Sequence, residues 1–175
     1  MKIPTYLKKG DTIGITCAAG YMASDKAQTC ITTLQKWGYH VMVGKTLGSI
    51  STNYFSGTDE DRRDEVQAML DDATINAILF GRGGYGVGRI VDQLDFTKFK
   101  KNPKWIIGFS DVTVIHSHLN KQGIATIHGI MPFNVEKASA VVEETLRKAL
   151  FGESLKYTVP FQKDNRLGVA EGELV

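Results

Sequence analysis

The amino-acid sequence predicts a three-layer α/β domain with a mostly parallel sheet, of the Rossmann or flavodoxin-like kind. Short apolar runs alternate with segments of helical character along most of the chain, which is typical of a parallel sheet covered on both faces. Two of the runs, 75–80 (INAILF) and 105–109 (WIIGF), are almost continuously apolar. Strands buried on both faces of a sheet have this composition, so both runs are expected to be buried strands.

The first half of the chain is expected to fold as strand, helix, strand and helix. These elements cover 11–19 (DTIGITCAA), 25–37, 39–44 (YHVMVG) and 59–71. Ser24 is a potential N-cap of the first helix, and Gly38 is a typical residue to end it. Thr58 is a potential N-cap of the second helix, whose first turn holds three acidic residues that favour the positive end of the helix dipole.

The second half continues the alternation and then changes character. Its expected elements are the strands 75–80, 105–109 and 124–129 and the helices 87–94, 111–121 and 138–150. After residue 152, SLKYTVP and RLGVAEGELV have strand character without a helix between them. We therefore expect an N-terminal α/β domain over 1–152. Residues 153–175 are expected to be a crossover segment that begins a second, β-rich domain absent from this sequence.

The composition of the 175 residues is that of an ordinary globular protein, with 42% hydrophobic and 23% charged residues. The net charge of +2 gives no reason to expect a nucleic acid or a membrane as partner. Two cysteines occur, Cys17 and Cys30, which suits a reducing compartment, and Cys17 is expected to be a small buried thiol. No stretch resembles a secretory signal or a membrane span, so the sequence predicts a cytoplasmic protein.

Ser110 stands directly between the strand 105–109 and the helix expected over 111–121. Loops at the carboxyl ends of parallel strands form the ligand crevice of such sheets. A serine on a sharp strand-to-helix turn can act as a nucleophile, with the amide of the next residue, Asp111, donating to an oxyanion. The turn departs from the G-x-S-x-G pattern, because Val112 replaces the second glycine. The serine can also cap the helix, so the residues alone leave both roles open.

The glycine-rich loop 81–86 (GRGGYG) follows the strand 75–80 and reaches the same edge of the sheet. Its backbone amides could bind a phosphate or complete an oxyanion hole. The glycine spacing does not match the dinucleotide fingerprint, and the loop does not follow the first strand, so a Rossmann nucleotide site is not expected. Close approach to a substrate carbonyl, with one amide donating to the oxyanion, suits the loop better.

A serine nucleophile requires a base, and none of the four histidines is clearly placed to act as one. His116 and His118 lie on the helix that runs away from Ser110, and His40 begins a strand at the opposite edge of the sheet. His128 ends a strand at the correct edge, but a single histidine there is more often bound by backbone groups. The residues therefore predict a nucleophile and an oxyanion hole without a convincing base.

The chain resembles the LD-carboxypeptidase family of serine peptidases, which includes the microcin C immunity peptidases. The matching segments follow the order of the family and cover nearly the whole chain: LKKGDTIGIT, YFSGTDEDRRDEVQAML, FGRGGYGVGRIVDQLDF, PKWIIGFSDVT and IHGIMP. The chain departs from the family at 17–20 (CAAG), where many members have a proline-containing turn. The resemblance therefore covers both the glycine loop and the turn that contains Ser110.

The resemblance implies a role for each of five residues. Ser110 would be the nucleophile of a Ser-Glu-His triad, and the amides of Asp111 and Gly84 would form the oxyanion hole. Arg82 and Tyr85 would contact the substrate. The implied substrate is a small murein peptide in the cytoplasm, cleaved between an L-residue and a D-residue without a metal or cofactor.

In the family, the Glu and the His of the triad come from a C-terminal domain, so neither is expected in this chain. Glu171 and Glu173 belong to the crossover segment and are not expected to be the triad acid. The chain alone is therefore expected to be inactive. The alternatives are cleavage of peptidyl or aminoacyl nucleotides by the same machinery, and a non-enzymatic module that binds a partner or forms a homodimer.

Overall fold

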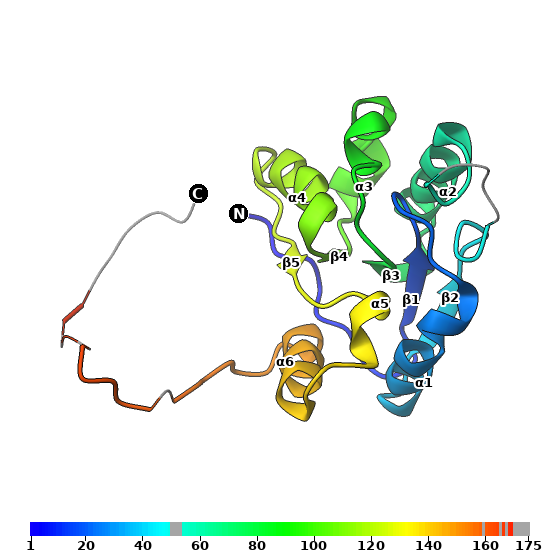
Figure 1. Cartoon of the computed structure of the whole chain (residues 1–175). Helices are drawn as coiled ribbons and strands as arrows, with labels where there is room; N and C mark the ends of the chain where they lie inside the picture. Colours follow the sequence, from blue (N-terminus) through cyan, green and yellow to red (C-terminus); the bar gives the residue numbers. More distant parts are fainter. Residues whose placement is uncertain (50–53, 159, 165, 167, 170–175) are drawn as a thin grey trace.

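A computed structural model describes residues 1–49, 54–158, 160–164, 166 and 168–169 of the chain. Figure 1 shows a central sheet with helices on both sides. Within the described residues, the sheet has five parallel strands in the order β2-β1-β3-β4-β5. The strands are β1 (Thr12–Thr16), β2 (His40–Val43), β3 (Ile75–Phe80), β4 (Trp105–Gly108) and β5 (Ile127–His128). The predicted α/β fold with a parallel sheet is confirmed.

The strand order creates a crevice at the carboxyl ends of the strands. From β1 the chain crosses outward to β2, and it then returns past β1 to place β3 on the other side. The connection from β1 to β2 and the connection from β3 to β4 lie on opposite faces of the sheet. This leaves an opening between the loops that follow β1 and β3. The loops after β1, β3 and β4 meet in this region.

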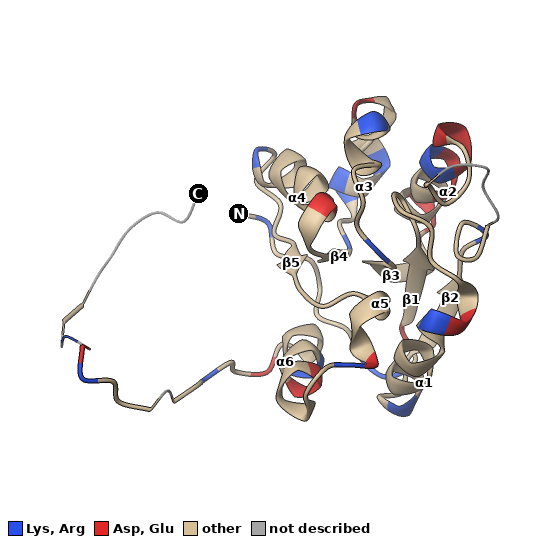
Figure 2. Ribbon diagram, in the orientation of Figure 1, with Lys and Arg blue, Asp and Glu red and all other residues tan. Residues whose placement is uncertain are grey.

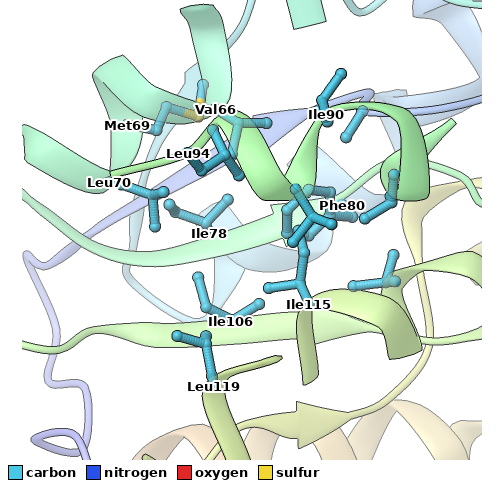
Figure 3. Packing of buried hydrophobic residues seen from close by; sticks show 14 of the residues in the cluster. Val66, Met69, Leu70, Ile78, Phe80, Ile90, Leu94, Ile106, Ile115 and Leu119 are labelled. Atoms are coloured by element: carbon cyan, nitrogen blue, oxygen red, sulfur yellow. The ribbon is translucent and has the colours of Figure 1, made fainter. Parts of the chain in front are cut away.

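Each face of the sheet is covered by helices. On one face, α2 (Asp59–Asp71) and α4 (Thr113–Asn120) bury apolar side chains against β3 and β4 (Figure 3). This cluster includes Val66, Met69, Leu70, Ile78, Phe80, Ile106, Ile115 and Leu119. On the other face, α1 (Gln28–Lys36) and α6 (Ala140–Phe151) cover the sheet. That cluster includes Ile13, Ile15, Leu34, Leu79, Ile107, Leu146 and Leu150. The central strands β3 and β4 are therefore buried on both sides, as their apolar composition indicates.

The N-terminus of α2 agrees with its predicted signals. The Thr58 hydroxyl oxygen accepts a hydrogen bond from the Asp61 amide at 3.1 Å, and the Asp61 carboxylate accepts one from the Thr58 amide at 2.9 Å. This reciprocal pair is a capping box, and the bonds from Thr58 lower the pKa of Asp61. Acidic and basic residues lie side by side on α2 (Figure 2).

The helix predicted over 87–94 is wrong. Two 3-10 helices, Val87–Arg89 and Val91–Gln93, take its place. The segment is only about two helical turns long and contains Gly88, and short glycine-containing segments gain little from α-helical hydrogen bonds. Its apolar residues are nevertheless buried, so the pattern indicated the buried side chains correctly and the helix type incorrectly.

The boundaries of several other helices and strands differ by a few residues from the predicted ones. Ser24–Ala27 form a 3-10 helix ahead of α1, and Ser24 is not an N-cap, because Ala23 occupies that position. Two short helices were not predicted: α3 (Thr97–Lys101) and α5 (Pro132–Val135). Proline in the first turn of α5 is a common signal for the start of a helix.

The described residues after Gly152 form no helix or strand. The strand character predicted for SLKYTVP is therefore not seen in residues 154–158. Contacts with α6 include an ion pair between Glu153 and Arg147 and a hydrogen bond from the Tyr157 hydroxyl to Thr145 Oγ1 at 2.8 Å. Residues 170–175, which include Glu171 and Glu173, lie outside the described part. Within the described ranges, no helix has both the length and the apolar character needed to cross a bilayer.

Candidate active site

A cleft of about 510 Å³ lies where the loops after β3 and β4 meet. It is lined by Tyr54, Arg82, Gly83, Gly84, Tyr85, Phe109, Ser110, Asp111, Met131, Phe133 and Asn134. All five residues predicted to be catalytic or substrate-binding are in this set. The structure thus brings together residues from two separate loops of the sequence.

A second cavity of about 550 Å³ lies between β2 and α2, away from Ser110. Two of the polar residues that line it, Glu65 and Thr46, bind each other. Glu65 accepts hydrogen bonds from the Thr16 hydroxyl at 2.7 Å, the Thr46 hydroxyl at 2.5 Å and the Thr46 amide at 3.0 Å. These bonds tie α2 to the end of β1 and to the loop after β2, which is a structural role.

Ser110 lies on a strained turn after β4 and is the first residue of the 3-10 helix Ser110–Val112, which leads into α4. Its φ angle is +61°, in the left-handed region that costs free energy for a residue with a Cβ atom. The residue is exposed, and it is not the N-cap of either helix, since Phe109 and Val112 hold those positions without side-chain capping bonds. A strained and exposed serine matches a nucleophile elbow better than a helix cap.

Gly108 explains how the turn forms without the second glycine of the G-x-S-x-G pattern. A Cβ atom on Gly108 would lie 2.9 Å from a methyl carbon of Val112. Close packing of the strand end against the helix start therefore depends on glycine at position 108. Val112 fills the space that this glycine leaves and is fully buried.

Gly83 directly faces Ser110 across the cleft. A Cβ atom on Gly83 would lie 3.1 Å from Ser110 Oγ and 3.3 Å from the amide nitrogen of Asp111. Gly84 has a φ angle of +132°, and a Cβ atom there would lie 2.7 Å from the Tyr54 hydroxyl oxygen. The close approach of the loop to Ser110 and Tyr54 therefore requires glycine at both positions. Gly83 and Gly84 both line the cleft, and Gly83, which was not among the predicted site residues, lies opposite the serine.

Arg82 places a positive charge in the cleft. Its guanidinium donates to the carbonyl oxygen of Tyr21 at 2.8 Å. The guanidinium carbon lies 4.8 Å from the ring centre of Phe133 and 5.7 Å from that of Tyr54, distances at which cation–π attraction operates. Tyr85, also predicted to contact substrate, has a φ angle of +58° and a side chain that is 89% exposed.

The histidines lie mostly outside the cleft. His116 is buried, and its Nε2 is 2.9 Å from the carbonyl oxygen of Gly108. The ring of His118 packs against Phe96, with ring centres 4.8 Å apart. His128 is exposed at the end of β5, and its ring centre is 6.2 Å from that of Phe109.

The described residues give little support to a cysteine nucleophile or to a metal site. Cys17 is fully buried, and burial raises the pKa of its thiol to about 12, so the thiol is not a nucleophile at neutral pH. Within the described ranges, no group of three or more His, Cys, Asp or Glu side chains is arranged to hold a metal ion.

The burial of His116 predicts that the protein loses stability in mild acid. Burial lowers the pKa of His116 below the ordinary value of 6.5, and the nearby His128 lowers it further. The unfolded chain then takes up a proton as the pH falls through about 6.5, while the folded chain resists it, so the free energy of unfolding decreases. Chemical denaturation at pH 7.5 and pH 5.5 measures this change.

His116→Gln is expected to reduce that pH dependence, because the amide group can still donate to Gly108 and does not titrate. His40→Gln, at an exposed position on β2, is the matched control and should retain the wild-type difference. An unchanged pH dependence in His116→Gln would show that other groups cause the loss of stability.

Comparison with known proteins agrees with this geometry. The family model of the LD-carboxypeptidase N-terminal domain matches residues 13–129. The chain is 31% identical to a probable murein peptide carboxypeptidase of Bacillus subtilis, over 98% of this chain and 56% of the relative. It is also 31% identical to the microcin C7 self-immunity protein MccF of Escherichia coli, over 70% of this chain and 37% of that protein.

Solved structures show the same fold. The structure of MccF in complex with glutamyl sulfamoyl guanosine has a TM-score of 0.79 and 25% sequence identity, covering 90% of this chain and 50% of the other. A muramoyltetrapeptide carboxypeptidase from Oxalobacter formigenes has a TM-score of 0.70 and 27% identity, covering 79% and 47% respectively. The chain therefore spans about half the length of the proteins that it resembles. It belongs to the LD-carboxypeptidase family and contains that family's N-terminal domain.

Proposed function

We propose that this chain supplies the nucleophile and the oxyanion hole of a serine carboxypeptidase that cleaves murein peptides in the cytoplasm. The bond cleaved joins an L-residue to a D-residue. The supporting observation is the position of Ser110, which is strained, exposed and opposite Gly83 in a cleft. Membership of the family supports hydrolysis of a peptide as the reaction class, and relatives named as murein peptide carboxypeptidases support the substrate.

In the proposed reaction, Ser110 Oγ attacks the carbonyl carbon of the scissile amide and forms a tetrahedral intermediate. The negative charge on the former carbonyl oxygen is stabilised by the amides of Asp111 and Gly84. The amide C–N bond then breaks, and the amine leaves after taking up a proton. Water hydrolyses the acyl-serine ester, which releases the shortened peptide and restores the Ser110 hydroxyl.

The base that accepts the Ser110 proton is proposed to be a histidine, paired with a glutamate, in a second domain. This chain matches only 56% of the Bacillus subtilis relative, which leaves room for that domain in the relative. A serine hydroxyl without a base is a weak nucleophile at neutral pH. The isolated 175-residue chain is therefore expected to be inactive.

Arg82 is proposed to bind the free carboxylate at the end of the peptide, and Tyr85 to cover the bound substrate. A carboxypeptidase acts beside a terminal carboxylate, and guanidinium groups bind carboxylates through paired, charge-assisted hydrogen bonds. Arg82 is restrained by Tyr21 and by two aromatic rings, so little side-chain entropy remains to be lost when a ligand binds.

The direct test uses the product of the complete reading frame and a murein tetrapeptide with a D-residue at its carboxyl end. We expect release of that residue, and no release from the diastereomer with an L-residue in the same position. The 175-residue chain should release nothing from either peptide. Equal rates on both peptides, or hydrolysis by the 175-residue chain alone, would contradict the proposal.

A second candidate is cleavage of an aminoacyl nucleotide at the same site. The similarity to MccF bound to glutamyl sulfamoyl guanosine, with a TM-score of 0.79, favours it. The nucleophile and oxyanion hole would act identically, so the two activities differ in how the leaving group is bound. Aminoacyl sulfamoyl nucleotides assayed beside the tetrapeptide distinguish them by the ratio of kcat/KM values.

A further inference from the structure

We propose that the Asp111 carboxylate is a positioning group that holds the glycine loop against Ser110. Asp111 Oδ2 accepts hydrogen bonds from the Gly86 amide at 2.8 Å and from the Val87 amide at 2.9 Å. A carboxylate that accepts two amide hydrogen bonds makes a strong, charge-assisted contact. The catalytic consequence rests on the function proposed above, whereas the contact itself is independent of it.

The buried side chain of Arg62 supports the loop from beneath. Arg62 is 0% exposed, and its guanidinium donates to the carbonyl oxygens of Ala18 at 2.9 Å and Thr58 at 3.1 Å and also pairs with Asp59. A Cβ atom on Gly86 would lie 2.3 Å from the guanidinium, so the loop backbone rests directly on it. Gly86 is therefore enclosed between the Arg62 guanidinium below and the Asp111 carboxylate at its amide.

This arrangement links the two parts of the proposed oxyanion hole through one residue. The Asp111 backbone amide is one donor, and its side chain anchors the loop that brings the other donor. The Gly86 amide, which the Asp111 carboxylate binds, lies only two residues after Gly84 in sequence. A carboxylate on the turn that holds the nucleophile thus fixes the spacing between that turn and the loop. Catalysis depends on such spacing, since a displacement of about 1 Å can cost about 100-fold in rate.

The test compares Asp111→Ala, Asp111→Asn and Asp72→Ala in the product of the complete reading frame. Asp72 is the matched control, because its carboxylate also accepts two hydrogen bonds, from the amide and the hydroxyl of Thr74 at 2.8 Å and 2.7 Å. It does not line the cleft that contains Ser110. Each variant is measured for kcat and KM on the tetrapeptide and for hydrogen exchange of residues 83–87. All three variants retain the backbone amide at position 111.

Asp111→Ala is expected to lower kcat about 30-fold or more with KM changed less than threefold, and to speed amide exchange in 83–87. Asp111→Asn keeps an oxygen that can accept from both amides, so it should restore most of the exchange protection and part of kcat. Asp72→Ala should match the wild type in kcat and in the amide exchange of residues 83–87. Unchanged exchange in Asp111→Ala, or rates for Asp111→Asn no better than for Asp111→Ala, would overturn the proposal. If the wild type hydrolyses no substrate, the proposed function fails and the exchange data alone decide on the anchor.

Discussion

Ser110→Ala is expected to lower kcat/KM on a murein tetrapeptide by about 10³-fold or more while leaving the free energy of unfolding nearly unchanged. The loss follows because the substitution removes the only atom that attacks the scissile carbonyl in the proposed reaction. Stability should be retained because the residue is exposed and is not the N-cap of a helix. Steady-state kinetics and chemical denaturation of the complete gene product measure the two effects.

Ser117→Ala is the matched control, since Ser117 is an exposed serine on α4, a few residues along the same segment. It should retain wild-type activity and stability. Residual activity of Ser110→Ala within tenfold of the wild type would show that Ser110 is not the nucleophile. An equal loss in both variants would point to damage of the helix instead.

Gly83→Ala is expected to lower kcat by about 10² to 10³-fold, similar to the loss of an oxyanion-hole donor. The added methyl group would lie 3.1 Å from Ser110 Oγ and 3.3 Å from the Asp111 amide nitrogen. This is the space in which the oxyanion is proposed to form. Gly83 does not have a left-handed φ angle, so the effect should arise from occupied space and not from backbone strain.

Gly88→Ala provides the control for this substitution. Gly88 lies five positions later and has no left-handed φ angle, and a Cβ atom there would meet no atom of a more distant residue within 4 Å. Its activity should be that of the wild type. If Gly83→Ala also retains full activity, the glycine loop does not contribute to the oxyanion hole.

The fold could be predicted from the sequence because each strand is short, apolar and bounded by turn residues. The runs INAILF and WIIGF became the buried strands β3 and β4, and Thr58 became the cap of α2. The errors arose in short segments. Val87–Gln93 formed 3-10 turns because tertiary contacts, including the hydrogen bond from the Val87 amide to Asp111, shape a segment too short to be a stable α-helix.

The site could be predicted only in part. Ser110 and the glycine loop could be identified because each directly follows an apolar strand, and sharp turns at strand ends are marked by serine and glycine. The close approach of Gly83 to Ser110 could not be predicted, since it depends on which glycine faces the serine in three dimensions. The role of Arg62 was also hidden, because a charged residue on a predicted helix is usually exposed and this one is fully buried.

Covalent trapping shows directly whether Ser110 is the nucleophile. A phosphonate analogue of the tetrapeptide, with an electrophilic phosphorus in place of the scissile carbonyl, forms a stable bond with a nucleophilic serine. The complete gene product is treated with this analogue, digested, and analysed by mass spectrometry to locate the adduct. We expect one adduct on Ser110, formed much more slowly in Gly83→Ala. An adduct on another residue, or none in a protein that hydrolyses the tetrapeptide, would contradict this expectation.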